Sequence, residues 1–302
     1  MIDAHHHLWD PRAREYDWLG GGQPWASDED LAKLRHPFTL TELGPLATDA
    51  GVTSTVVVQT VDDEWETRDL LALAAGIDLD GNAVRSSRGS RLLAGVVGWV
   101  DLTSPDVENA VARLRAQPGG SFLRGIRHPL LGEPDPAWLT RPEVLRGLRG
   151  LGNTDLCFDV IALPHHFESV VVAARSVPEV RFVLNHLGGP PVGTGEQPGD
   201  NAWASTIRSL GELSNVTCKL SGMHGPSVRA GTLRPYYAIV LEAFGPDRLM
   251  FGSDWPVSSL AATYGEVCDV HQELTADLTA AEQAAVFDRT ARRVYGLGGA
   301  SA

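Results

Sequence analysis

The sequence predicts an α/β protein built as a (β/α)8 barrel. Short apolar, β-branched runs alternate with helix-like stretches eight times along the 302 residues. Most of these runs lack polar alternation, as expected for parallel strands that are buried on both faces. A doubly wound open sheet is the alternative, but no Gly-x-Gly-x-x-Gly motif follows an early strand.

The predicted strands are the apolar runs, and each is followed by turn or polar residues. They are Ile2–His7, Ser54–Gln59, Leu92–Asp101, Phe122–Arg127, Asp155–Ala162, Val180–His186, Val216–Gly222 and Arg248–Pro256. The main predicted helices between them, several of which start at a Pro or a polar cap, are Glu64–Ala75, Pro105–Ala116, Pro142–Leu151, Phe167–Ser176, Trp203–Leu213 and Tyr236–Ala243. The amphipathic segment Ala280–Leu297 is predicted to form a helix that packs against the outside of the barrel.

Residues 1–302 are predicted to form a single barrel domain, since no linker or second domain is evident. One long insert, at about residues 10–37, follows the first strand and carries Trp18 and Trp25. It belongs to the rim at the C-terminal ends of the strands, where barrel active sites are built. The insert is either a lid or a packed surface excursion, and the sequence leaves both open.

Charge and cysteine content narrow the class of partner and the compartment. The formal net charge is −13 and no cluster of Lys and Arg is present, which argues against nucleic acid and anionic membranes. A small-molecule substrate is expected instead, and a homo-oligomer stays open. Three cysteines do not make a disulfide framework, and neither a signal peptide nor an apolar run of roughly 20 residues is evident. We therefore expect a cytoplasmic protein.

The chemistry begins in IDAHHHLWD at the start of the chain. Side chains alternate along a strand, so His5 and His7 share one face and His6 takes the other. At the end of a first barrel strand, His5 and His7 would project into the mouth of the barrel. Such a pair either chelates a divalent metal or holds a substrate between two imidazoles, and a structural role is the alternative.

Two further polar residues end later strands on the same rim. His186 ends the sixth predicted strand in VLNHLGGPP, and Asp254 ends the eighth in FGSDWP. A lone histidine at a strand end is usually structural, but three histidines and an aspartate on one rim form a constellation. We therefore expect His5, His7, His186 and Asp254 to form one site.

The motifs IDAHHHLWD, GIRH, VLNHLGGP, CKLSG and LMFGSDWPV, in that order, resemble the amidohydrolase superfamily. Within it, the chain is most similar to the sugar-acid lactonases, such as the fuconolactonases and rhamnonolactonases, and to pyrone-dicarboxylate lactonase. The resemblance runs from Ile2 to about Leu297 and implies a distorted (β/α)8 barrel. The family residue before the sixth-strand histidine is often Asp, whereas this chain has Asn185.

The resemblance implies roles for individual residues. His5 and His7 match the first-strand pair, His186 matches the sixth-strand histidine, and Asp254 matches the aspartate that handles the proton of the attacking water. His186 and Asp254 are therefore the expected catalytic residues, and all four are candidate metal ligands. Arg127 matches an arginine that orients the substrate. The bridging lysine of many dinuclear relatives is not evident, which leaves one divalent metal, with zinc expected, or none.

Other residues are candidate substrate contacts by their position on the rim. They are His128, Gln59, Trp255, Lys219 and His165, with Lys219 alternatively a barrel-interior charge paired with a carboxylate. The predicted reaction is hydrolysis of a small lactone, most simply a sugar-acid lactone, by activated water. A metal-dependent decarboxylase of the same superfamily is one alternative, and a non-catalytic metal-binding barrel is a second.

Overall fold

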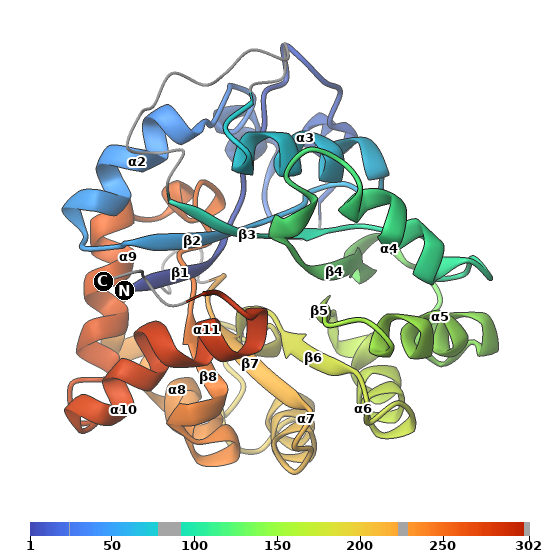
Figure 1. The fold of residues 1–302 in the computed structure, drawn as a ribbon. Helices are drawn as coiled ribbons and strands as arrows, with labels where there is room; N and C mark the ends of the chain where they lie inside the picture. Colours follow the sequence, from blue (N-terminus) through green and yellow to red (C-terminus); the bar gives the residue numbers. More distant parts are fainter. Residues whose placement is uncertain (24, 78–91, 223–228, 299–302) are drawn as a thin grey trace.

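The computed structural model describes residues 1–23, 25–77, 92–222 and 229–298. Eight parallel strands follow one another in the order β1 to β8 (Figure 1). Backbone bonds from Asp254 N to His5 O, 2.7 Å, and from His7 N to Trp255 O, 2.7 Å, join the last strand to the first. The nearly closed barrel predicted from the sequence is confirmed. The strands are β1 (Ile2–His6), β2 (Ser54–Val58), β3 (Leu93–Gly98), β4 (Leu123–Pro129), β5 (Cys157–Ile161), β6 (Arg181–Leu184), β7 (Val216–Leu220) and β8 (Leu249–Phe251).

Helices surround the strands, and their apolar faces cover the outer side of the barrel (Figure 1). Those that the sequence predicts are α3 (Glu64–Ala74), α4 (Val107–Arg115), α5 (Pro142–Gly152), α6 (Phe167–Ser176), α7 (Ala202–Gly211) and α8 (Ala230–Phe244). Three more were not predicted, namely α1 (Asp28–Lys33), α2 (Leu40–Asp49) and α9 (Tyr264–Leu274). The sequence did not predict α2 because Pro45 lies inside it, and proline is normally unfavourable in the interior of a helix.

The C-terminal segment corrects one expectation. It forms α10 (Ala280–Ala284), a π-helical turn (Ala285–Arg289) and α11 (Thr290–Tyr295). Seen from the N-terminal end of the barrel, α11 lies across the strands (Figure 1). Val294, Tyr295 and Leu297 belong to the same buried cluster as the inward apolar residues of the strands, such as Val183 and Met250. The segment therefore closes the bottom of the barrel instead of covering its outside.

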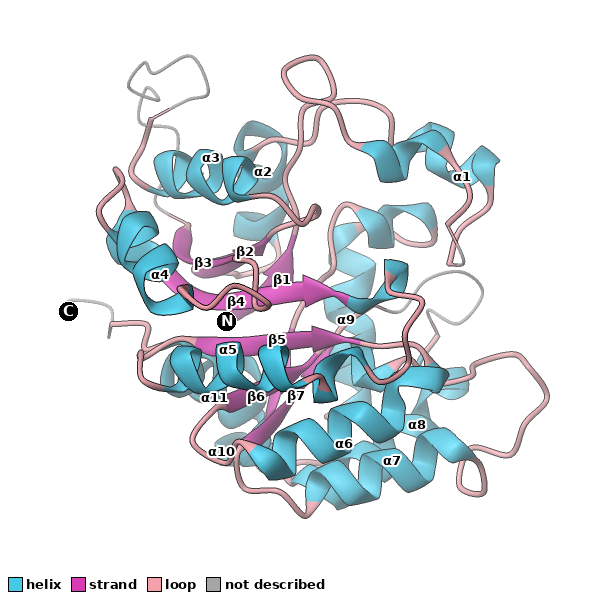
Figure 2. Cartoon of the chain, turned by 90° about the vertical axis from the view of Figure 1, so that its right-hand side faces the viewer, coloured by secondary structure: helices cyan, strands magenta, loops and turns pink. Residues whose placement is uncertain are grey.

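The opposite end of the barrel carries the long loops. In Figure 2 the strands point toward the side on which α1 and the rest of the 10–37 insert lie. Trp9, just before the insert, packs edge to face on Trp18 of the insert and on Phe38, just after it, with ring centroids 5.0 and 5.1 Å away. None of the described helices is long and apolar enough to cross a membrane.

An irregularity in β1 sets the direction of its histidines. The register with β2 shifts between Asp3 and His6, which is a β-bulge. Ala4 belongs to the buried cluster inside the barrel, whereas the His6 ring lies 3.0 Å from the Thr55 hydroxyl. Burial lowers the pKa of His6 to about 3, so its ring is neutral.

Candidate active site

The first-strand histidines meet the eighth-strand aspartate at the C-terminal end of the barrel. Nε2 of His5 lies 3.5 Å from Oδ1 of Asp254, and Nε2 of His7 lies 3.3 Å from the same oxygen. The two Nε2 atoms are 3.3 Å apart. All three side chains are buried, and Gly252 makes room for them, because a Cβ there would lie 2.6 Å from the Cβ of His5.

His186 completes the group from the end of β6. Its ring centroid lies 4.6 Å from that of His5, and its Nδ1 is 3.0 Å from the Ser221 hydroxyl. Gly222 is required beside it, since φ is +70° there and a Cβ would clash with the His186 ring. His186 and Asp254 both have φ of 57°, a left-handed conformation that costs about 1–2 kcal/mol in most residues. Strained backbone therefore coincides with the two expected catalytic residues.

A buried ion pair lies beneath these histidines. Lys219 Nζ donates to Asp159 Oδ2 at 2.6 Å, and both side chains are fully buried. Asp159 also accepts from the Tyr295 hydroxyl at 2.9 Å and from Asn185 Nδ2 at 3.0 Å. Burial lowers the pKa of Lys219, and Asp159 opposes that shift. Lys219 thus lies inside the barrel in contact with a carboxylate, which is the alternative that the sequence left open.

Lys219 also fixes the hydrogen positions on the first-strand pair. Its Nζ lies 3.2 Å from Nδ1 of His5, and because an ammonium only donates, that nitrogen accepts and Nε2 of His5 carries the hydrogen. His7 has the opposite tautomer, since its Nδ1 donates to the Val58 carbonyl at 2.7 Å. Burial lowers the pKa of both rings. Neutral His7 therefore presents a lone pair on Nε2 to the site.

Arg127 enters the same space from β4 and is held by Gln59. Its Nε and Nη2 donate to the Gln59 side-chain oxygen at 3.0 and 2.8 Å, and Nη2 also donates to the Gln59 carbonyl. The Gln59 amide returns a bond of 3.2 Å to the Arg127 carbonyl. Gln59 is thus fully buried and orients the arginine. The described residues that line the cavity include Arg127 but not Gln59.

A cavity of about 740 Å³ opens above this group. Its buried floor includes His7, Arg127 and Asp254, with the half-buried His186 beside them. Its walls come from the loops after the strands and from the insert, which contributes Trp18 and Trp25. The described site residues therefore face a space large enough for a small ring compound.

The other predicted contacts divide by position. His128 lines the cavity, stacked on Trp138 at 3.9 Å, and Trp99 Nε1 donates to its Nδ1 at 3.3 Å. Burial lowers the pKa of His128 to about 4, so the neutral ring keeps its hydrogen on Nε2. Trp255 instead packs against Phe38, and His165 is exposed beside His166. Of these, the described cavity lining includes His128 but neither Trp255 nor His165.

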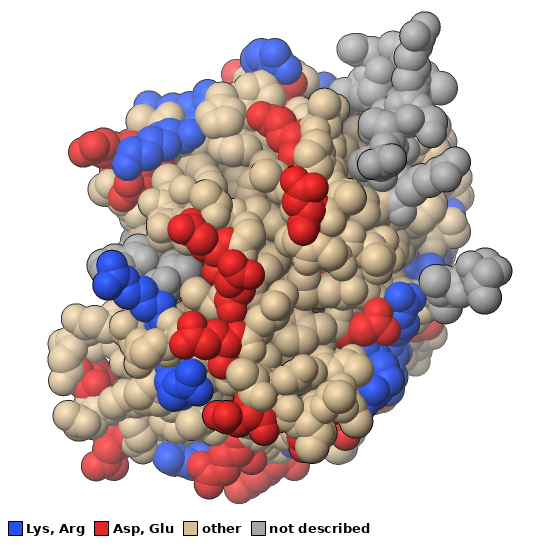
Figure 3. All heavy atoms as spheres, turned by 90° about the vertical axis from the view of Figure 1, so that its left-hand side faces the viewer, with Lys and Arg blue, Asp and Glu red and all other residues tan. Residues whose placement is uncertain are grey.

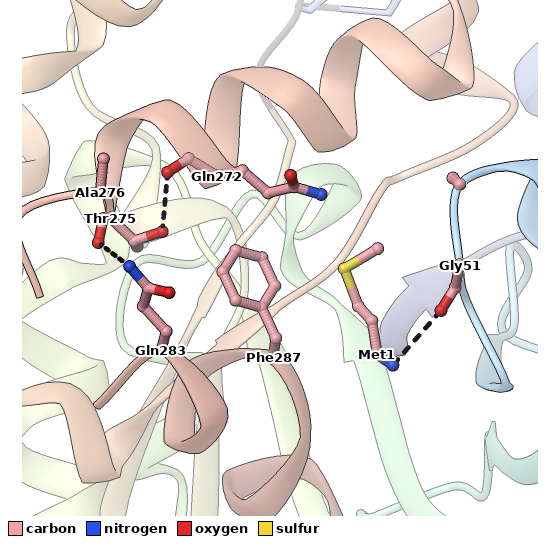
Figure 4. Close-up of a pocket in the computed structure, with 8 residues that line it drawn as sticks. Met1, Gly51, Gln272, Thr275, Ala276, Gln283 and Phe287 are labelled. Carbon is pink, nitrogen blue, oxygen red and sulfur yellow. Dashed lines mark hydrogen bonds between the residues drawn. The ribbon is translucent and has the colours of Figure 1, made fainter. Parts of the chain in front are cut away.

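A second hollow, of about 550 Å³, lies near the N-terminus (Figure 4). Its lining includes Phe287 and the amides of Gln272 and Gln283, and Gln283 bonds to the Thr275 carbonyl at 3.1 Å. Among the described residues that line it, none carries an imidazole, carboxylate or guanidinium group. Hydrolytic chemistry therefore belongs to the first cavity.

The residues beneath the site were not identified from the sequence. Asp159, Ser221, Gly222 and Tyr295 each contact a functional side chain or its partner. Of these residues, Gly222 in the CKLSG motif had the clearest sequence signal, because a glycine after a strand often marks a place where another part of the chain approaches the backbone closely. Tyr295 lies 136 residues from Asp159 in sequence and carries no comparable signal.

The donor set is suited to one divalent metal ion. Ligand atoms of His5, His186 and Asp254 all lie within 4.8 Å of one another. Imidazole nitrogens and a carboxylate are ligands that zinc accepts. Binding through Nε2 of His5 would displace the hydrogen that Lys219 keeps there.

Comparison with known proteins assigns the chain to a family. Residues 2–297 match the amidohydrolase family. This protein belongs to that family. It is 35% identical over 268 residues to an L-fucono-1,5-lactonase of Burkholderia ambifaria, covering 88% of this chain and 83% of that one. It is 34% identical to an L-fucono-1,5-lactonase of Burkholderia multivorans over 98% of this chain and 96% of that one.

A solved structure agrees with the sequence relatives. It is a Burkholderia multivorans amidohydrolase with bound zinc, which superposes with a TM-score of 0.84 at 32% identity, over 98% of this chain and 99% of that one. The predicted membership of the amidohydrolase family is thus confirmed, and the chain is a hydrolase.

Proposed function

We propose that this hydrolase opens a sugar-acid lactone by attack of water on the ring carbonyl. The observation that carries the proposal is the contact of the Asp254 carboxylate with His5 and His7, 3.5 and 3.3 Å away, at the floor of the cavity. The names of the relatives from Burkholderia support the substrate class, and L-fucono-1,5-lactone is the first compound to test.

Each residue has a part in the reaction. Asp254 takes a proton from water and returns it to the leaving alkoxide. Arg127 has its Nε and Nη2 engaged by Gln59, so its remaining nitrogen, Nη1, is the group that we assign to the substrate. A donor placed against a developing oxyanion contributes roughly 3 kcal/mol in comparable sites. His128 offers a further donor, Nε2–H, to a ring oxygen.

The histidines serve in either of two ways. His5 donates through Nε2 and His7 accepts through Nε2, so together they orient a water molecule beside Asp254. A divalent metal, held by His5, His186 and Asp254, would polarise the carbonyl or lower the pKa of bound water. We propose zinc as that metal.

A panel of aldonolactones with a pH indicator tests the function, because ring opening releases a proton at neutral pH. We expect turnover of at least one member, and a fall in kcat of about 1000-fold in Asp254→Asn, the range of general acid–base catalysis. Asn tolerates the left-handed backbone of position 254, so the variant should fold.

The exposed Asp269→Asn is the matched control, with the same change in charge. No turnover across the panel, or full activity in Asp254→Asn, contradicts the proposal. Release of CO2 from a carboxylic acid would identify the decarboxylase alternative. Metal analysis of the same sample decides whether zinc accompanies activity.

A further inference from the structure

The mouth of the catalytic cavity is lined by carboxylates. Glu15, Asp17, Asp62, Asp63 and Glu133 all line it, and we call them the carboxylate rim. The first four are exposed and Glu133 is half-buried, whereas Asp254 at the floor is 2% exposed. Among the described residues that line the cavity, six carboxylates accompany one guanidinium, that of Arg127.

The rim is assembled from three separate parts of the chain. Glu15 and Asp17 belong to the 10–37 insert, Asp62 and Asp63 follow β2, and Glu133 follows β4. Within the described part of the chain, Glu133 is the rim member in an ion pair, 4.0 Å from Arg141. Among the described residues, the charge of the other four rim members is therefore not offset by an ion pair.

The remaining polar groups of the lining do not offset this charge. Asp62 and Glu133 lie close enough to His128 to favour its charged form, yet desolvation dominates and holds the ring neutral with a pKa of about 4. Burial also keeps His7 neutral. Arg127 is at the buried floor, where Gln59 engages it. A molecule that leaves the cavity thus passes from a floor that holds the Arg127 guanidinium to a mouth lined by carboxylates.

Hydrolysis of a lactone changes the charge of the bound molecule. The water oxygen bonds to the carbonyl carbon, the ring C–O bond breaks, and its electron pair takes a proton as a hydroxyl. The carboxylic acid product then loses a proton to solvent and becomes a carboxylate. A neutral lactone has no net charge–charge interaction with the rim carboxylates, whereas the negatively charged product is repelled by them.

We propose that the carboxylate rim speeds release of the anionic product and excludes lactones that already carry a carboxylate. This inference rests on the proposed lactonase function. Glu15, Asp17, Asp62, Asp63 and Glu133 are thus specificity-determining residues that act through charge on the way in and out of the cavity.

The double variant Asp62→Asn/Asp63→Asn tests the rim. Asp63 caps α3 through a 3.0 Å bond from Trp65 N, and Asn caps helices equally well, so the fold is preserved. The probe is L-fuconate as an inhibitor of L-fucono-1,5-lactone hydrolysis. At low salt we expect its inhibition constant to fall about fivefold in the variant, with KM for the neutral lactone changed less than about twofold.

The matched control is Asp49→Asn/Asp269→Asn, which removes the same charge from α2 and α9. Both positions are exposed, and neither is among the residues that line the cavity. Figure 3 shows the side of the molecule that carries α2 and α9, where several Asp and Glu side chains form a band. At 0.5 M salt the rim variant and the wild type should converge, because screening shortens the range of the repulsion to a few Å.

The inference is overturned if the inhibition constant of L-fuconate falls equally in both double variants. It is also overturned if KM for the neutral lactone falls by the same factor as the inhibition constant. An unchanged inhibition constant in the rim variant overturns it as well, while wild-type turnover leaves the lactonase function standing. Absence of wild-type turnover on every lactone is the separate result that rejects the function itself.

Discussion

The two ends of the barrel interior are built from the same strands but follow different rules. The N-terminal half is apolar, filled by residues such as Val183 and Met250 and closed by α11. The C-terminal half holds histidines, an arginine and an aspartate on partly left-handed backbone. The Lys219–Asp159 pair lies between the two halves. The N-terminal half requires only apolar side chains of the right size and shape, whereas the C-terminal half requires specific hydrogen bonds and ion pairs between individual residues.

The largest effect is expected at this boundary. Lys219→Met would leave the Asp159 carboxylate buried without a cation, at a cost of about 3–5 kcal/mol in the free energy of unfolding. Denaturant unfolding of Lys219→Met, Asp159→Asn and the double variant measures it. The double variant should recover most of the loss, because no uncompensated charge remains. A loss that is additive in the double variant would show that the two residues do not act as a pair.

The sequence predicted the apolar half better than the polar half. Apolar runs located all eight strands, because a buried parallel strand needs little beyond length and β-branched residues. The amphipathic pattern of Ala280–Leu297 indicated a buried face but not which surface covers it. The predicted position of this segment, on the outside of the barrel, was therefore wrong. A helix pattern specifies one side of a contact only.

In the polar half, the sequence predicted that His5, His7, His186 and Asp254 would gather at one rim, and the structure brings them together. Strand ends converge in any barrel, so this much follows from topology. Hydrogen positions do not follow from topology. The tautomer of His5 depends on Lys219, which lies 214 residues away and is directed by another distant residue, Asp159.

A residue next to the polar half should also make the free energy of unfolding depend on pH. Glu66 in α3 accepts from Thr60 N at 2.6 Å, the Thr60 hydroxyl at 2.6 Å and Val61 N at 3.0 Å, which holds the loop before the carboxylate rim. Burial raises its pKa from 4.5 to about 7, although these donors act in the opposite direction. Its stabilising contribution is complete below about pH 4.5 and is lost as the pH rises through about 7.

Glu66→Gln tests this, because its side-chain oxygen can accept both N–H groups and its amide can donate to the Thr60 hydroxyl. The loss in the wild type relative to the variant should reach about 3 kcal/mol, at about 1.4 kcal/mol per unit of pKa. Unfolding free energies measured between pH 4 and 8 give that difference. Parallel curves for the two proteins would assign the pH dependence to other groups.

The smallest effect is expected where the apolar half touches the boundary pair. Tyr295→Phe removes the 2.9 Å bond from the α11 hydroxyl to Asp159 but keeps the ring in the buried cluster. Lys219 and Asn185 still donate to the carboxylate, so we expect a loss of about 1.5 kcal/mol in unfolding free energy. Thermal unfolding measures this loss of stability, and steady-state kinetics on the same preparation measure kcat and KM.

We expect kcat to stay within about threefold of wild type in Tyr295→Phe, because Lys219 remains in place to donate to His5. If kcat instead falls more than tenfold while KM is unchanged, the hydroxyl at the bottom of the barrel sets the position of Lys219, and the two halves are not independent. Three hydrogen bonds connect Tyr295 to His5, through Asp159 and Lys219. The kinetic result therefore decides whether that connection carries function or only supports the fold.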